Sequence, residues 1–304
     1  EECRSNLQDI AYRARERGIK VIDEQLWEKE NGRWQLVMKV MVKDGCVTTR
    51  ELTKAVAGAL NRRMIPEKDT KTLIGKGVNL YTYEEEPRFQ AIYGVARMVK
   101  DGAAVSGDNF SFLEPESGKM VMCLSDGMGS GSLACKESEM VIELVEKFLE
   151  AGFDVETAAR MMNSAMVMKG QEDLFSTVDI SELDLYDGTC RFYKIGAAAT
   201  FIRRNGIVEC LISTSLPVGV SYKLDMEKSE KDLYNGDFLV MVSDGVLEYL
   251  HVPNPEETMQ EIIESIETNN ATILAKRILE RVLLFTGGKA ADDMTVLATA
   301  IWEK

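Results

Sequence analysis

Two Ser-Asp-Gly tripeptides stand directly after apolar runs of the chain. Ser125-Asp126-Gly127 follows residues 121–124, and Ser243-Asp244-Gly245 follows residues 238–242. A carboxylate at the end of an apolar run is expensive to bury unless a partner offsets its charge. Position therefore sets Asp126 and Asp244 apart as candidates for chemistry. The pairs Asp44-Gly45, Asp101-Gly102 and Asp187-Gly188 are typical of ordinary turns.

Two further acidic turns could join these carboxylates. Asp108, in Ser106-Gly107-Asp108, precedes one expected strand, and Asp292, in the run 291–295, opens the last one. Carboxylates gathered at strand ends would repel one another, and a divalent cation would remove that cost. Oxygen ligands without His or Cys favour a hard ion, so the pattern predicts Mg²⁺ or Mn²⁺. The single histidine, His251, excludes a zinc site of the His-rich kind.

The glycines beside Asp126 do not fit a nucleotide cradle. Gly127, Gly129 and Gly131 have the spacing GxGxG, whereas a dinucleotide fingerprint needs GxGxxG. The Gly-Lys pairs of the chain lack the Ser or Thr that completes a P-loop. We expect the glycines instead to let the main chain bend, so that a carbonyl can act as a ligand beside the Asp side chain. A nucleotide-binding transferase is disfavoured for the same reason.

The composition limits the partners of the protein. The 304 residues carry a formal net charge of -14, which argues against nucleic acid as a ligand. The longest apolar stretches, such as residues 238–242, are far shorter than the roughly 18 to 20 residues that span a bilayer. Six scattered cysteines without CxxC spacing are typical of a reducing compartment. Because the chain begins with Glu1 and shows no signal peptide, we expect a piece of a longer protein.

The elements that must position the acidic turns are strands in hairpins and helices in pairs. From residue 89 onward, strand-like runs are joined by Asp-Gly and Asn-Gly hairpin signals. This arrangement favours an α+β fold, in which helices cover antiparallel sheets, over alternating βαβ units. Apolar periodicity predicts the paired helices at 132–150 and 155–168, and at 256–267 and 271–285.

The N-terminal part has its own organisation. An amphipathic helix over 2–17 precedes two strand-like runs joined across Asn31-Gly32, and a second helix is expected over 48–64. The acidic run 84–86 before Pro87 predicts a boundary, which gives domains 1–86 and 87–304. The first is either a partial domain or a regulatory or dimerising module, which leaves a homodimer open.

Six motifs of the second part carry a family resemblance. They are VSGDNFSFLE (105–114), LSDGMGSG (124–131), DLYDGTCRFYKIGAAATFI (184–202), SLPVGV (215–220), VSDGVLE (242–248) and ADDMTV (291–296). In this order they resemble the metal-dependent serine/threonine phosphatases of the PPM (type 2C) family, above all its bacterial sporulation members. The resemblance implies an antiparallel β-sandwich flanked by helix pairs.

The resemblance also implies a site with two Mn²⁺ or Mg²⁺ ions and a nucleophilic water between them. Asp126 would bridge the ions, and the carbonyl of Gly127 would ligate the first. Asp244 and Asp292 would ligate the second, which makes Asp126, Asp244 and Asp292 the catalytic carboxylates. Asp108 would contact the metal cluster more weakly or through water.

Two nearby residues are kept out of this expected site. Asp293 stands where many relatives have Asn, so it is treated as a neighbour of the ligands. Many relatives grip the phosphate with an Arg near the start of the domain, and this chain shows no clear match. Arg97 is nearest in the chain and is left outside the site.

The resemblance implies a biological role as well. The substrate would be an anti-sigma factor antagonist phosphorylated on serine, whose dephosphorylation releases a sporulation sigma factor. The full protein would be membrane-anchored through an absent N-terminal region, with this chain in the cytoplasm and division-septum proteins as partners. The alternative is a PPM-fold scaffold or binding module that is weakly active until a partner or the N-terminal module completes the metal site. The helix at 132–150 could transmit such control, because it begins directly after the acidic turn.

Overall fold

The computed structural model describes residues 2–29, 32–67, 70–116, 118–129, 131–168 and 175–304. The chain divides into two compact units, Glu1–Pro87 and Arg88–Lys304. Each unit has apolar cores of its own, which lets each fold around its own buried side chains.

The first unit is an antiparallel sheet with two helices packed beside it. The strands lie in the order β1-β2-β6-β4, and a two-stranded ribbon joins β3 to β5. Residues Ile10, Leu36, Val56 and Tyr83 meet in its core. The elements are α1 (Glu2–Glu16), β1 (Ile19–Glu28), β2 (Trp34–Val42), β3 (Val47–Thr48), α2 (Thr49–Leu60), β4 (Met64–Pro66), β5 (Leu73–Ile74) and β6 (Asn79–Glu85).

Both helices expected in this unit are confirmed. The second helix ends earlier than predicted, because Asn61 takes the left-handed conformation, with a φ of 50°, that stops a helix. The predicted hairpin is confirmed by the antiparallel pairing of Glu28 with Trp34. Of its predicted turn, Asn31 lies outside the described residues.

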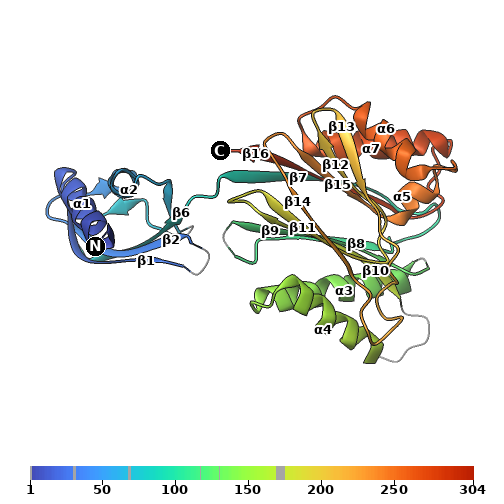
Figure 1. The fold of residues 1–304 in the computed structure, drawn as a ribbon, viewed down its shortest axis with the longest axis horizontal. Helices are drawn as coiled ribbons and strands as arrows, with labels where there is room; N and C mark the ends of the chain where they lie inside the picture. Colours follow the sequence, from blue (N-terminus) through green and yellow to red (C-terminus); the bar gives the residue numbers. More distant parts are fainter. Residues whose placement is uncertain (1, 30–31, 68–69, 117, 130, 169–174) are drawn as a thin grey trace. The chain divides into compact units, whose positions relative to one another are not determined.

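The second unit is a sandwich of two five-stranded antiparallel sheets (Figure 1). The β9 sheet has the strand order β14-β11-β10-β9-β8, and the β15 sheet has the order β13-β12-β15-β16-β7. The strands of the β9 sheet are β8 (Asp108–Leu113), β9 (Lys119–Gly127), β10 (Ser176–Asp184), β11 (Thr189–Ile195) and β14 (Glu227–Asp232). Those of the β15 sheet are β7 (Phe89–Met98), β12 (Thr200–Arg204), β13 (Ile207–Leu211), β15 (Phe238–Val242) and β16 (Met294–Glu303).

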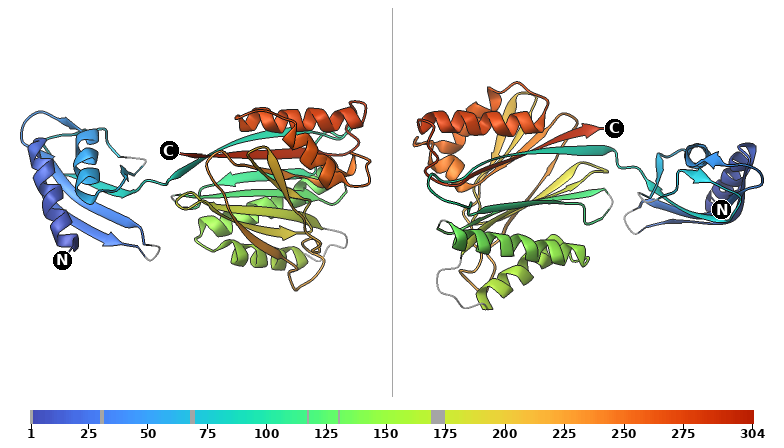
Figure 2. Two further views of the ribbon diagram at one scale, coloured as in Figure 1. Left: turned by 45° about the horizontal axis from the view of Figure 1, so that its top comes forward. Right: turned by 180° about the vertical axis from the view of Figure 1, so that it is seen from behind.

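Helices cover the outer face of each sheet, as both views in Figure 2 show. The pair α3 (Ser132–Glu150) and α4 (Val155–Met168) packs on the β9 sheet through buried residues such as Val145 and Met162. The pair α6 (Pro255–Glu264) and α7 (Ala271–Phe285), with the short α5 (Asp244–Glu248), packs on the β15 sheet. The α+β sandwich flanked by helix pairs is therefore confirmed.

Two boundaries differ from the expectation in a way that matters for the acidic turns. Strand β9 continues through Asp126 and Gly127, because both pair with β10, so the turn begins only after Gly127. Asp244 lies at the start of α5 and not in a turn.

Strand β14 was not predicted from the sequence, because its residues, EKSEKD, include no apolar residue and form an exposed edge.

Within the described part of the chain, no helix is long and apolar enough to cross a membrane.

The packing of α7 predicts the cost of truncating its buried face. Leu274 is fully buried against the β15 sheet, whereas Leu284 on the same helix is 74% exposed. We expect Leu274→Ala to lower the free energy of unfolding by about 2 to 5 kcal/mol because it leaves a cavity. The matched change Leu284→Ala should cost well under about 1 kcal/mol. Urea unfolding followed by circular dichroism measures both, and equal losses would contradict this placement of α7.

Candidate active site

Two neighbouring strands bring the first pair of carboxylates together. Asp108 begins β8 and lies directly opposite Asp126 of β9 in the antiparallel register. Residues directly opposite in such a pair project to the same face of the sheet. On its other side Asp126 pairs with Thr177 of β10, whose hydroxyl accepts a hydrogen bond from the Asp126 amide at 3.3 Å. The two acidic side chains are thus held by strand pairing and not by a flexible loop.

The third carboxylate comes from the other sheet. Asp244 follows β15 directly and lies in the first turn of α5. Its carboxylate and that of Asp108 lie within hydrogen-bonding reach of Asp126. Three of the predicted site residues therefore meet where the two sheets converge.

The electrostatics of this meeting are unfavourable. Burial, followed by the neighbouring Asp244 and Asp108, raises the pKa of Asp126 strongly. Burial also raises the pKa of Asp108, with smaller contributions from Asp244 and Asp293, while the hydroxyls of Thr295 and Ser243 oppose the rise. Asp126 and Asp108 are therefore easier to protonate than in water, because ionising them in a buried place beside other carboxylates is costly.

The donor set fits a hard cation. Asp108 is fully buried, and neither of its carboxylate oxygens has a hydrogen-bond partner of normal geometry. Unpartnered buried oxygens beside other carboxylates are the groups that Mg²⁺ or Mn²⁺ would satisfy. Among the described residues, however, no three His, Cys, Asp or Glu side chains already stand as a complete metal cluster. The carboxylates would have to rotate to take up an ion.

Asp292 lies at the Asp244 side of this group. A Cβ built on Gly245 would stand 3.3 Å from the Cβ of Asp292. The Asp292 side chain is 30% exposed, and its Oδ1 lies 3.7 Å from the Nζ of Lys100. Asp292 also joins Asp244 in raising the pKa of Glu248, after burial. The structure thus places Asp292 next to the predicted cluster, with a basic and an acidic neighbour.

Asp293 holds two loops in place. Its Oδ1 accepts a hydrogen bond from the amide of Lys100 at 2.9 Å, and its Oδ2 accepts one from the amide of Gly107 at 2.7 Å. Gly107 immediately precedes Asp108, so this clamp fixes the start of β8. Because both Asp293 oxygens serve the backbone, its interpretation as a neighbour of the ligands agrees with its contacts.

Gly127 is the point where helix α3 meets the site. A Cβ on Gly127 would lie 2.1 Å from the carbonyl oxygen of Ala134, so only glycine fits under the helix. The Ser138 hydroxyl of α3 donates to the carbonyl oxygen of Gly107, and the side-chain amide of Asn109 donates to the Ser138 hydroxyl at 2.8 Å. The first turns of α3 are therefore bonded to the start of β8, which carries Asp108, and cover the end of β9, which carries Asp126.

Arg97 lies near the site, but its described contacts go to the scaffold. One guanidinium nitrogen donates to the backbone carbonyl of Asp108 at 2.6 Å, and the group lies over the ring of Phe110.

Two charged neighbours of the site, Lys100 and Glu248, were not predicted from the sequence. Glu248 could have been found, because it lies four residues after Asp244 and so on the same face of a helix. Lys100 had no local signal, because its position depends on the last strand.

The raised pKa of Asp126 predicts a gain in stability when a neutral amide replaces its carboxyl group, because the folded protein at neutral pH must either protonate this group or hold it ionised beside Asp244 and Asp108. With a chelator present, we expect Asp126→Asn to raise the free energy of unfolding at neutral pH by about 1 kcal/mol. Asp101→Asn, in an exposed turn, is the matched control and should change little. Thermal unfolding of both variants measures the effect. A lower unfolding temperature for Asp126→Asn than for the parent would contradict the repulsion.

Comparison with known proteins places the chain in a family. The family model "Stage II sporulation protein E (SpoIIE)" matches residues 116–301. The stage II sporulation protein E of Bacillus subtilis is 29% identical over 285 residues, which cover 93% of this chain and 34% of that protein. The chain thus spans about a third of the length of this relative.

Solved structures agree with the sequence matches. The PP2C phosphatase domain of Bacillus subtilis SpoIIE, with a fragment of its regulatory domain, superposes with a TM-score of 0.74 at 27% identity. That match covers 100% of this chain and 88% of the other. Phosphoserine phosphatase RsbX of the same organism is 35% identical over 86 residues, which are 28% of this chain and 41% of RsbX.

The fold of RsbX extends this likeness beyond the aligned segment. A crystal structure of RsbX in complex with magnesium has a TM-score of 0.54 at 20% identity, and the match covers 70% of this chain and 95% of RsbX. The likeness at this identity concerns the fold alone. Because the family model matches more than half of its residues, the chain belongs to the stage II sporulation protein E family. Its second unit, in which the acidic strand ends converge, is a PP2C-type phosphatase domain.

Proposed function

We propose that this chain is a Mn²⁺- or Mg²⁺-dependent protein serine phosphatase. Its substrate would be a phosphoserine on an anti-sigma factor antagonist, whose dephosphorylation releases a sporulation sigma factor. The observation that carries the proposal is the meeting of Asp108, Asp126 and Asp244 from two sheets of a PP2C-type sandwich. The family supports the substrate, and it also supports a cytoplasmic location in a longer, membrane-anchored protein.

The residues would share the work as follows. The Asp126 side chain interacts with both Asp108 and Asp244, so it is suited to bridge two cations. The Gly127 carbonyl would add a ligand on the β9 side, and Asp244 and Asp292 would serve the other side. Two bound cations would activate a water for in-line attack on phosphorus and offset the charge on the phosphoryl oxygens.

Other residues would keep this arrangement in place. Asp293 would hold the loop before Asp108 through its bonds to Lys100 and Gly107. The buried position of Asp108 would keep its oxygens out of bulk water and aimed at the cations. The strongly acidic chain would otherwise repel a phosphorylated protein, so hydrolysis would depend on these cations for substrate binding as well.

Release of phosphate tests the proposal directly. The intact chain is incubated with a phosphoserine protein and Mn²⁺, and the release of inorganic phosphate is measured. We expect Asp126→Ala and Asp244→Ala each to lower turnover by roughly a hundredfold or more, because each removes a ligand that both charges and orients the site. The control Asp187→Ala removes an exposed turn aspartate and should retain the parental rate. Parental rates in both site variants would show that the assignment is wrong.

A second proposal concerns control of this activity. The described carboxylates do not form a complete metal cluster, and α3 rests directly on Gly127. We infer that the phosphatase domain is weakly active until the N-terminal module or a partner shifts α3 and so completes the metal site. A scaffold role without appreciable hydrolysis is the limiting case of this proposal.

Comparison of the whole chain with residues 88–304 tests this control. We expect removal of residues 1–87 to change Mn²⁺ affinity and turnover together by about fivefold or more, because coupling between sites is typically about 1 to 3 kcal/mol. Titration calorimetry gives the affinity, and phosphate release gives the turnover. Identical values for the two proteins would rule out a role of the first unit.

A further inference from the structure

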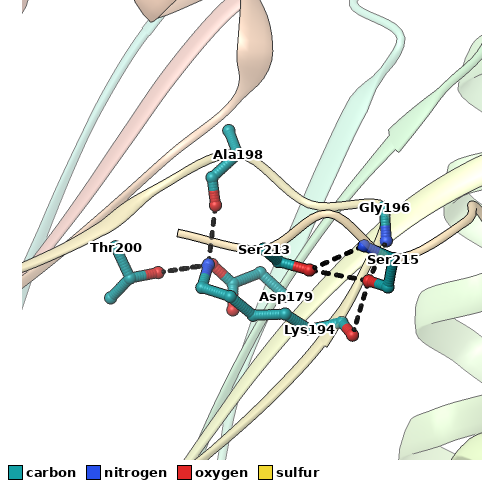
Figure 3. A network of polar contacts seen from close by, with 7 residues as sticks. All are labelled: Asp179, Lys194, Gly196, Ala198, Thr200, Ser213 and Ser215. Atoms are coloured by element: carbon teal, nitrogen blue, oxygen red, sulfur yellow. Dashed lines mark hydrogen bonds and ion pairs between the residues drawn. The ribbon is translucent and has the colours of Figure 1, made fainter. Parts of the chain in front are cut away.

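A buried polar network lies between the two sheets of the phosphatase domain (Figure 3). Lys194 of β11 and Asp179 of β10 form an ion pair, with Nζ 2.6 Å from Oδ2 and only 5% and 2% of the two side chains exposed. The same Nζ donates to the hydroxyl of Thr200 at 2.8 Å and to the carbonyl oxygen of Ala198 at 2.6 Å. Thr200 in turn donates to Asp179 Oδ2 at 2.5 Å. All three ammonium protons are therefore used.

This network joins one sheet to the other. Strands β10 and β11 belong to the β9 sheet, whereas Thr200 begins β12 of the β15 sheet. Ala198 lies in the segment that crosses between the sheets, as Figure 3 shows. The rest of the described contact between the sheets is largely apolar, so the network is a directional bond within a non-directional interface.

Folding stability alone does not account for the network. Taking an ammonium and a carboxylate out of water costs several kcal/mol for each ion, and apolar side chains of similar volume often replace such a pair without loss. Asp179 also leaves its Oδ1 buried without a hydrogen-bond partner. What the network adds is geometry, because a set of hydrogen bonds fixes the distance and register of the two sheets.

The strand register connects this geometry to the site. Asp179 lies opposite Leu124 of β9, two residues before Asp126. Thr200 lies opposite Met241 of β15, three residues before Asp244. In each sheet, the network therefore lies on the strand that neighbours β9 or β15, the strands that lead to Asp126 and Asp244.

A second set of bonds extends toward Gly127. The hydroxyl of Ser215 donates to the carbonyl oxygen of Lys194 at 3.1 Å and accepts from the amide of Gly196 at 3.0 Å. Further along the same segment, the amide of Val218 donates to the carbonyl oxygen of Ser176 at 2.9 Å. Ser176 lies opposite Gly127 in the β9–β10 register. The network and the last residue of β9 are thus linked through one continuous loop.

We propose that the Asp179–Lys194–Thr200 network is a positioning device that sets the spacing of the two sheets at their site end, so that the carboxylates of Asp126 and Asp244 meet at the separation divalent cations need. The inference rests on the proposed metal-dependent function. None of the three residues touches the reacting atoms, so each is a positioning residue and not a catalytic one.

Thr200→Val gives the sharpest test. It removes the hydroxyl that bridges the sheets, conserves the side-chain shape and leaves the ion pair with its bond to Ala198. The matched control is Thr299→Val, because Thr299 is 1% exposed in β16 and donates across the same sandwich to the Met122 sulfur at 3.2 Å. Mn²⁺ binding to the intact chain is measured by titration calorimetry, and thermal unfolding is measured with a chelator.

We expect Thr200→Val to raise the Kd for Mn²⁺ by about fivefold or more, which is within the usual range for residues that act on a site from a distance. Thr299→Val should change the Kd by less than about twofold while lowering the unfolding temperature to a similar degree. Equal losses of affinity in both variants would overturn the proposal, because they would reflect general loosening of the sandwich. An unchanged Kd in Thr200→Val would overturn it as well.

A double variant separates positioning from stability. Lys194→Met alone would strand a buried Asp179 and is expected to unfold the domain. Asp179→Leu combined with Lys194→Met removes both charges but leaves the buried Thr200 hydroxyl without these partners, so it should unfold at a temperature moderately below that of the parent and bind Mn²⁺ about fivefold more weakly. A parental Kd in this variant would overturn the proposal. If the parent itself bound no Mn²⁺, the proposed function would fail first, a result distinct from a binding parent with unaffected variants.

Discussion

The fold of the phosphatase domain must hold several carboxylates together against their mutual repulsion. Asp108, Asp126 and Asp244 approach one another in a partly or fully buried place, and burial and proximity raise the pKa of Asp108 and Asp126. A loop could not hold such groups together, because it would swing apart to separate the charges. Strand pairing on one side and a strand-to-helix junction on the other keep them in place.

The surrounding contacts can be understood as support for that arrangement. Asp293 fixes the loop before β8 through two backbone amides, and the carbonyl of Ala134 closes over Gly127. Behind the site, the hydroxyl of Thr200 in the β15 sheet bonds to Lys194 and Asp179 of the β9 sheet and so joins the two sheets. The first two contacts hold β8 and the end of β9, and the third lies on strands that neighbour β9 and β15. The domain therefore uses directional polar bonds at the places where apolar packing could not resist the repulsion.

Much of this could be predicted from the sequence because it depends on local pattern. An Asp after an apolar run signals a costly carboxylate, and apolar periodicity located α3, α4 and α7. The exposed strand β14 has no such pattern, so only its pairing with β11 defines it. The role of Lys194 could not be predicted either, because a lone Lys in a strand normally indicates the face exposed to solvent. Its burial depends on Asp179 and Thr200, which reach it only when the sheets pack.

The same repulsion explains why control could enter through a helix. Carboxylates that already resist being together need only a small change in spacing to alter their joint affinity for a cation, because the interaction between charges is steep at short distance. Helix α3 bonds to Gly107 through Ser138 and covers Gly127, so its movement would displace both strand ends of the β9 sheet. The β15 sheet would not follow freely, because the Lys194 network fixes it behind the site. A shift of α3 would thus act on the distance from Asp126 to Asp244 and not on the sandwich as a whole.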